Sequence, residues 1–389
     1  MTKSLRINEI EPFHVMALLA RAKELEAQGK DIIHMEIGEP DFPTPQPIVD
    51  AGIDAIKNGD VHYTPALGLP TLREAIAQFY KTRYAVNISS KRIAITPGAS
   101  GALMLALGVI LQEGDEVLLA DPGYPCNKNF VRFLSGKTRS IPVDASSSYQ
   151  LTLKHLQDNW AEKTRVVMVA SPSNPTGTLI PQDELAKMAK FVKEKGGYLI
   201  VDEIYHGLIY EGEADTALNN KHDGIDENII VINSFSKYFN MTGWRLGWLV
   251  APDNLTVNMD KLAQNIFLAA PTPAQYAALS AFKAETIKIL ELHKDEFLQR
   301  RNFLLPKLKK LGFKIETEPQ GAFYIYANCE KFTNDSYQFA YDMLENIGIA
   351  ITPGKDFGVN KANTFVRFAY TTSIERLEEA INRLTRYLA

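Results

Sequence analysis

Lys237 and Arg245 are the residues whose types and spacing most directly suggest chemistry. They lie in the stretch 234–248, between apolar, β-branched runs at 229–232 and 246–250 that are typical of buried strands. A desolvated lysine has a lowered pKa, and its neutral amine can form a Schiff base with a carbonyl group. The planar guanidinium of Arg245 suits a phosphate or a carboxylate. A loop with two solvated cations explains this stretch equally well, so the surrounding elements must decide.

Polar segments that follow other apolar runs could join these two cations. Segment 96–103 places Ala99 and Ser100 at the start of a helix, 121–125 contains Tyr124, 171–178 contains Asn174, and 202–205 contains Asp202 and Tyr205. Each segment has a plain structural explanation on its own, namely a helix start, aromatic packing, a turn and a helix cap. Together they offer backbone N–H groups, a flat ring, an amide and a carboxylate.

The elements that must position these residues are short strands alternating with helices. Strands are expected at 93–95, 116–120, 138–141, 166–170, 198–201, 229–233 and 246–250, with helices at 101–111, 153–160 and 181–195. This alternation predicts an α/β fold with a mostly parallel central sheet sandwiched by helices. Ligands of such sheets bind at the carboxyl ends of the strands, where the polar segments lie.

The flanking regions predict further helices and a second, smaller α+β domain. We expect helices at 12–28, 47–57 and 71–84, the last opened by a capping box of Thr71 and Glu74, and one long helical stretch over 272–310. After residue 313 we expect strands at 314–315, 322–326, 349–352 and 364–370, and helices at 335–346 and 374–388. The predicted units are an N-terminal arm with part of the small domain (1–45), a large domain (46–285) and a small C-terminal domain (286–389).

Composition excludes several classes of function. The chain has 389 residues, of which 46% are apolar and 23% charged, and its net charge of −4 gives no electrostatic case for nucleic acid. Cys126 and Cys329 are far apart, so no disulfide framework and no metal site is expected. No apolar run is long enough to span a bilayer, and the charged start has no hydrophobic leader segment. We therefore expect a cytoplasmic protein without a membrane partner.

The strand-end residues together match the parts of one cofactor. A phosphate, a flat ring, a phenolic oxygen, a ring nitrogen and an aldehyde make up pyridoxal phosphate. The helix start at Ala99 suits the phosphate, Tyr124 the ring face, Asn174 the oxygen and Asp202 the nitrogen. Lys237 then has an aldehyde to react with, and pyridoxal phosphate becomes the expected cofactor.

The chain resembles the class I pyridoxal-phosphate-dependent aminotransferases of fold type I, which include the aspartate, alanine and aromatic enzymes. The resemblance covers nearly the whole length. It is most specific at Ser-Pro-Ser-Asn-Pro-Thr-Gly (171–177), Asp-Glu-Ile-Tyr (202–205), Ser-Phe-Ser-Lys (234–237) with Arg245, and Phe-Val-Arg (365–367). Tyr63 and Gly38 also match the family pattern.

This resemblance implies a role for each matching residue. Lys237 would bind the cofactor aldehyde and move a proton between the substrate Cα and the cofactor. Asp202 would pair with the ring nitrogen, Asn174 and Tyr205 with the phenolic oxygen, and Tyr124 with the ring face; Ala99, Ser100, Ser234 and Arg245 would hold the phosphate; Arg367, Gly38 and Asn174 would bind the substrate carboxylate. Tyr63 would reach the phosphate in the other subunit, which implies a homodimer.

The resemblance implies transfer of the α-amino group of an L-amino acid to a 2-oxo acid such as 2-oxoglutarate or pyruvate. Relatives that act on aspartate usually carry an extra basic residue, and one subgroup has a lysine where this chain has Ser100. The region 264–271, which approaches the neighbouring site in relatives, contains no arginine. We therefore expect a preference for uncharged side chains, such as alanine, aliphatic or aromatic residues.

Two alternatives remain open from the sequence. A carbon–sulfur β-lyase on the same fold would keep the lysine, the aspartate and the carboxylate arginine, although the segment 243–248 is more like that of the transaminases. A regulatory or sensor protein that binds the cofactor without turnover is the second alternative. Such regulators usually add a DNA-binding domain, and no segment of this chain is left over to form one.

Overall fold

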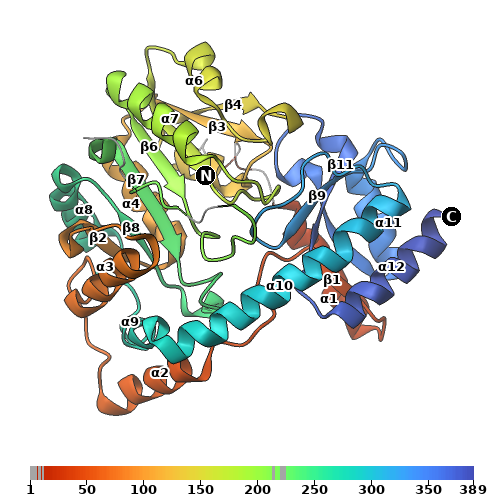
Figure 1. The fold of residues 1–389 in the computed structure, drawn as a ribbon, viewed down its shortest axis with the longest axis horizontal. Coiled ribbons are helices and arrows are strands. Elements are labelled where there is room, and N and C mark those ends of the chain that lie inside the picture. Colours follow the sequence, from red (N-terminus) through yellow and green to blue (C-terminus); the bar gives the residue numbers. More distant parts are fainter. Residues whose placement is uncertain (1–6, 8–9, 11–12, 213–214, 220–224) are drawn as a thin grey trace, which may run out of the picture.

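The computed structural model describes residues 7, 10, 13–212, 215–219 and 225–389. A large sheet with its helices occupies one side, a small sheet with its helices the other, and α10 (Ala284–Leu311) runs between them (Figure 1). Within the described ranges, no helix combines the length and the apolar character that crossing a membrane requires.

The large sheet has seven strands in the order β2-β8-β7-β6-β5-β3-β4. Their bounds are β2 Ile93–Thr96, β3 Glu116–Asp121, β4 Lys137–Pro142, β5 Thr164–Ala170, β6 Tyr198–Asp202, β7 Ile229–Ser234 and β8 Gly247–Val250. Strands β3 to β7 pair in parallel, whereas β8 is antiparallel to both of its neighbours. The parallel strands thus present their carboxyl ends at one edge, as the sequence predicted.

Both faces of this sheet are covered, because successive residues along a strand contribute to different cores. In β5, Val166 and Met168 pack on the side of α4 (Gly98–Ile110) and α8 (Asp253–Ile266), whereas Val167 and Val169 face the opposite core. That opposite core includes residues of α3 (Pro70–Tyr84) and α7 (Gln182–Glu194). The strands therefore read as continuous apolar runs rather than as alternating ones.

The small sheet joins the two ends of the chain. Its order is β1-β10-β11-β9, formed by Ile33–Met35, Ile349–Pro353, Phe365–Ala369 and Tyr324–Asn328. Ile33 of β1 pairs in parallel with Ile349 of β10, although more than three hundred residues separate them. The helices α1 (His14–Ala27), α11 (Ser336–Ile347) and α12 (Ile374–Leu388) pack around this sheet. The N-terminal segment thus belongs structurally with the C-terminal part.

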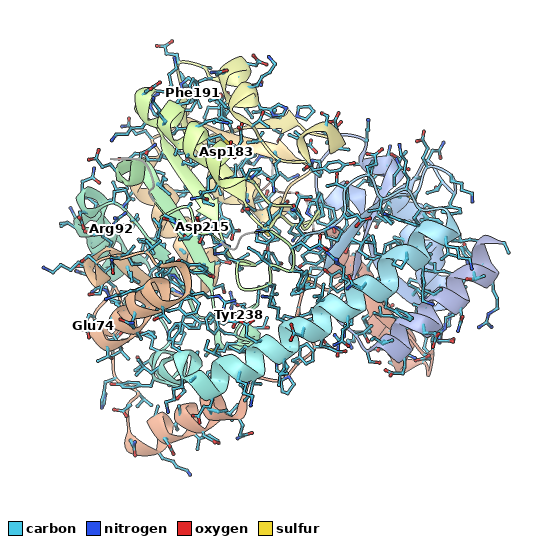
Figure 2. The ribbon with its side chains drawn as sticks, viewed as in Figure 1. Glu74, Arg92, Asp183, Phe191, Asp215 and Tyr238 are labelled. Carbon is cyan, nitrogen blue, oxygen red and sulfur yellow. The ribbon has the colours of Figure 1, made fainter. Side chains whose placement is uncertain are left out.

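Several local predictions were wrong for identifiable reasons. Pro70 occupies the first turn of α3 and Leu69 is the N-cap, so Thr71 and the exposed Glu74 (labelled in Figure 2) form no capping box. The stretch 272–310 is not one helix, because α9 (Thr272–Leu279) ends and a short turn precedes α10. The expected strand at 314–315 is only an isolated bridge to Asn328.

Other helices were not predicted or differ only at their ends. The helices α5 (Pro125–Phe133) and α8 were missed, whereas α2 (Gln46–Asn58) and α6 (Leu153–Asn159) lie where expected. The predicted helix 12–28 begins at residue 14 in the described part of the chain.

Candidate active site

One cavity of about 300 Å³ lies between the carboxyl ends of the large sheet, α1 and the small sheet. The predicted site residues that line it are Gly38, Ala99, Ser100, Tyr124, Asn174, Asp202, Tyr205, Ser234, Lys237, Arg245 and Arg367. They come from the ends of β2, β3, β5, β6 and β7, from β11 and from the loop after β1. Residues far apart in sequence therefore meet because parallel strands end at one edge.

Lys237 stands three residues after β7 and points into this cavity. Its Nζ donates to the Gly38 carbonyl at 2.5 Å. Burial lowers its pKa to about 8; the negative charge of Glu39 acts against this shift, and the positive charges of Arg367 and Arg245 add to it. The next residue, Tyr238 (labelled in Figure 2), bonds instead to Glu291 of α10 at 2.5 Å. The loop is thus anchored beside a lysine that loses its proton far more readily than a solvated one.

Asp202 ends β6 and is buried within the cavity wall. Its Oδ1 accepts from the Ile204 N–H at 2.9 Å. Burial raises the pKa of its carboxyl to about 6, while that hydrogen bond and the charge of Lys237 act in the opposite direction. A buried carboxylate is costly without a cationic partner, and a protonated ring nitrogen is such a partner.

Arg367, on β11, is a buried cation whose partners are neutral. Its guanidinium donates to Asn174 Oδ1 at 2.9 Å, to Thr352 Oγ1 at 3.1 Å and to the Glu36 carbonyl. Its Nε is buried without a hydrogen-bond partner, and no acidic side chain in the described part of the chain forms an ion pair with it. An orphaned donor on a buried cation marks a place for an anionic ligand.

The first turn of α4 and Arg245 form a second anion-binding site. The N-cap of α4 is Pro97, which provides no side-chain cap, so the first N–H groups of the helix lack helical partners. A Cβ added to Gly98 would come within 2.5 Å of an Nη atom of Arg245, and one on Gly247 within 2.7 Å of the Ala99 nitrogen. These glycines let the cation and the helix start approach one place, which suits a phosphate.

The hydroxyl of Ser234 already has partners within the chain. Its Oγ accepts from the Ser236 N–H at 3.0 Å and donates to the Leu246 carbonyl at 3.3 Å. The sequence assigned Ser234 to the phosphate and gave Ser236 only a structural role, and both residues line the cavity.

Three tyrosines, Tyr124, Tyr205 and Tyr324, line the cavity as well. Tyr205 and Tyr324 are both buried, and their hydroxyl oxygens lie 2.7 Å apart. Tyr124 lies in the wall near them, at the end of β3. Tyr324 was missed by the sequence reasoning, because nothing in strand β9 itself marks which of its tyrosines faces a site.

Tyr63 is the predicted site residue that the structure does not bring to this cavity. Its side chain is 83% exposed and does not line the cavity of its own chain. The sequence reasoning also missed an apolar wall from α1 and the residue before it, formed by Phe13, Val15, Met16 and Leu19. Their helical spacing was visible, but only the pairing of β1 with β10 brings α1 to the site.

Comparison with known proteins places the chain in a class. Residues 30–384 match the family model of aminotransferases of class I and II. The chain is 41% identical over 388 residues to the (5-formylfuran-3-yl)methyl phosphate transaminase of Methanocaldococcus jannaschii, covering 99% of each protein. It is 35% identical to an aspartate aminotransferase of Thermotoga maritima, again covering 99% of both. A crystal structure of an aminotransferase from Mycobacterium tuberculosis superposes with a TM-score of 0.95 at 36% identity, covering 100% and 99% of the two chains.

The fold and the site therefore define a pyridoxal-phosphate-dependent transferase of fold type I. The chain belongs to the class I and II aminotransferase family, and the protein is an enzyme that transfers amino groups with pyridoxal phosphate as cofactor. The cavity fits this cofactor, because it offers an uncapped helix start with Arg245, a buried carboxylate and a lysine with a lowered pKa. When bound, the cofactor supplies an aldehyde and an electron sink.

Proposed function

We propose that this aminotransferase takes its amino group from L-amino acids with uncharged side chains and passes it to 2-oxoglutarate or pyruvate. The carrying observation is the charge inventory of the cavity. Among the described residues that line it, the basic ones are Lys237, Arg245 and Arg367. Each has a task at the aldehyde, the phosphate or the substrate α-carboxylate, so none remains for the second carboxylate of a donor such as aspartate. Of the two acceptors, pyruvate has a single carboxylate and needs no further cation, whereas 2-oxoglutarate needs one that these residues do not supply.

The apolar wall of the cavity supports the same preference. Phe13, Val15, Met16 and Leu19 from the α1 region are joined there by Ile37. Apolar side chains gain free energy by leaving water for such a wall, whereas a carboxylate loses hydration without a partner. The relatives are named as transaminases of a furan derivative and of aspartate. Their similarity therefore supports amino transfer, whereas the proposed amino donor rests on the cavity lining.

The proposed roles of the chain's residues follow from their positions. Lys237 would hold the cofactor aldehyde and would move a proton between the substrate Cα and the cofactor. Its lowered pKa makes the neutral amine available near neutral pH. Asp202 keeps the ring nitrogen protonated, and Tyr205 and Asn174 donate to the phenolic oxygen. Tyr124 lies against the ring face.

The proposed partners of the two anionic groups, the cofactor phosphate and the substrate α-carboxylate, are mainly backbone N–H and guanidinium groups. Ala99 and Ser100 N–H groups, the Ser234 hydroxyl and Arg245 hold the phosphate. At the other end Arg367, with the Gly38 N–H and Asn174, holds the α-carboxylate. The orphaned Nε of Arg367 supports this assignment.

A homodimer is part of the proposal. Tyr63 is exposed, and so are the apolar side chains of Ile56 (62%), Val61 (52%), Ile266 (43%) and Leu268 (55%). Large apolar side chains left in water favour a surface that a second subunit covers. We propose that Tyr63 crosses this interface to the phosphate of the partner subunit, and that the segment 264–271 borders the neighbouring site.

The division into residues 1–45, 46–285 and 286–389 and a cytoplasmic location complete the proposal. The pairing of β1 with β10 supports the grouping of the N-terminal arm with the small domain. The ordinary composition supports the location.

A comparison of amino donors tests the proposed substrate class. Purified holoenzyme is mixed with alanine, methionine, phenylalanine or aspartate, and the decay of the visible cofactor band gives the rate. We expect the second-order rate constant of the fastest uncharged donor to be at least ten times that of aspartate. A faster reaction with aspartate would overturn the proposed preference while leaving amino transfer intact.

A further inference from the structure

Tyr324 is a buried cavity residue that contacts Tyr205, Arg367 and Gly38. Its hydroxyl lies 2.7 Å from that of Tyr205, and the Cζ of Arg367 lies 4.1 Å from the centroid of its ring. A Cβ on Gly38 would come within 2.1 Å of its hydroxyl oxygen, so the Gly38 loop closes directly over it. A residue placed only for packing has no need of this hydroxyl.

The two hydroxyls share one hydrogen bond, so only one of them donates. Within the described residues, each hydroxyl is the other's only hydrogen-bond partner. The proposed role of Tyr205 is to donate to the phenolic oxygen of the cofactor, which can only accept. Tyr205 has a single proton to give, so the bond between the tyrosines must then run from Tyr324 to Tyr205.

The surroundings favour Tyr324 as the donor. Burial raises the pKa of both hydroxyls, that of Tyr205 well above its ordinary value, and the charge of Arg367 acts in the opposite direction on both. The Arg367 guanidinium lies over the ring of Tyr324, whose hydroxyl is the more acidic of the two and therefore the better donor. A hydroxyl that accepts one hydrogen bond also becomes a better donor of the next.

We propose that Tyr324 is a positioning residue that fixes the proton of Tyr205 toward the phenolic oxygen of the cofactor. The inference rests on the proposed role of Tyr205. Its consequence is measurable because the phenolic oxygen carries its full negative charge only when the nitrogen of Lys237, attached to the cofactor, has lost its proton. A donor to that oxygen therefore favours the deprotonated form, and a weakened donor raises the pH midpoint of the change in visible absorption.

The test is a spectroscopic pH titration of the holoenzyme without substrate. Tyr324→Phe should raise the midpoint by about half to one pH unit, since the lost bond is one between neutral groups. Tyr205→Phe should raise it further, and the double variant should match Tyr205→Phe alone. The control is Tyr326→Phe, a buried tyrosine two residues along the same strand whose ring stacks on Phe365, and it should leave the midpoint unchanged.

A second variant tests the same bond without removing the hydroxyl. Gly38→Ala drives a methyl group onto the Tyr324 oxygen and should raise the midpoint in the wild-type background but not in Tyr324→Phe. An unchanged midpoint in Tyr324→Phe, or additive shifts in the double variant, overturns the inference alone. An unchanged midpoint in Tyr205→Phe overturns the role of Tyr205 and the inference with it.

Discussion

Three buried groups of this site lack a full set of partners within the chain. Arg367 has an orphaned Nε, Asp202 a raised pKa and Lys237 a lowered one. Burying such groups costs free energy in the absence of ligand. In the proposed assignment, an α-carboxylate, a ring nitrogen and an aldehyde respectively would relieve these costs.

The raised pKa of Asp202 predicts a pH-dependent effect on stability. A folded-state pKa of about 6 against 3.8 means that the folded apoenzyme binds more protons than the unfolded chain between these values. The contribution of protonated Asp202 to the free energy of unfolding is therefore fully present below pH 3.8 and is lost as the pH rises through 6. Asp202→Asn removes the ionisation but keeps an oxygen for the Ile204 N–H. We expect the variant apoenzyme to be more stable than wild type by about 1–3 kcal/mol at pH 7.5.

Urea unfolding of the cofactor-free proteins at pH 7.5 and pH 4.5 checks this expectation. The difference between variant and wild type should fall to about a third of its pH 7.5 value at pH 4.5, because the unfolded carboxyl, with a pKa of 3.8, is still mostly ionised there. With cofactor bound the order should reverse, because the ring nitrogen loses its partner. Equal apoenzyme stability at pH 7.5 would contradict the assignment of a strained carboxylate.

At the scale of elements, the meeting of α4 with β8 forms the proposed phosphate end of the cavity. Gly98 has φ +70° and lies against Arg245, and Gly247 lies against the start of α4. A side chain at either glycine would separate the helix start from the cation. The close approach of α4 and β8, rather than any one residue, therefore creates the anion-binding site.

Gly98→Ala tests this account of the phosphate end. The new methyl group meets Arg245 and the positive φ strains the backbone, so we expect at least tenfold weaker binding of pyridoxal phosphate. Pyridoxal, which lacks the phosphate, should bind the variant and the wild type alike. Gly243→Ala is the matched control, because a Cβ there meets nothing within 4 Å. Fluorescence titration measures all the affinities, and an equal loss for pyridoxal would argue against a phosphate site.

Sequence reasoning located the strand-end residues well, because a parallel sheet brings every carboxyl strand end to one edge. Asn174, Asp202 and Lys237 follow buried apolar runs, and the structure gathers them in one cavity. Tyr324 and the α1 wall escaped it, because their placement depends on contacts between distant segments. The antiparallel direction of β8 and the helix break before α10 also left no local signal.

At the scale of the whole molecule, the cavity is closed by parts that belong to different regions. The large sheet supplies the residues that we propose for the cofactor, whereas β11, the loop after β1 that contains Gly38, and α1 supply those that we propose for the substrate. Helix α10 links the two regions, with the buried Arg300 paired to Asp41 of the Gly38 loop at 2.7 Å. Substrate recognition therefore depends on how these regions meet.

The proposed dimer predicts complementation between two inactive proteins. Tyr63→Ala retains Lys237 but lacks the crossing tyrosine, and Lys237→Ala retains Tyr63 but lacks the amine. A mixed dimer contains one site with both residues, so unfolding and refolding an equal mixture should restore roughly a quarter of the wild-type sites, given random pairing. The measurement is the transaminase activity of the refolded mixture, compared with that of each variant refolded alone. A mixture no more active than the separate variants would count against Tyr63 crossing the interface.

The most direct test of amino transfer at Lys237 is a single-turnover reaction without an oxo-acid acceptor. Holoenzyme mixed with excess phenylalanine should lose its visible cofactor band and release one equivalent of phenylpyruvate per site, then stop. Lys237→Ala, loaded with cofactor, should release none on the same timescale. Continued release of 2-oxo acid and ammonia without an acceptor, or an undiminished reaction in Lys237→Ala, would contradict the account.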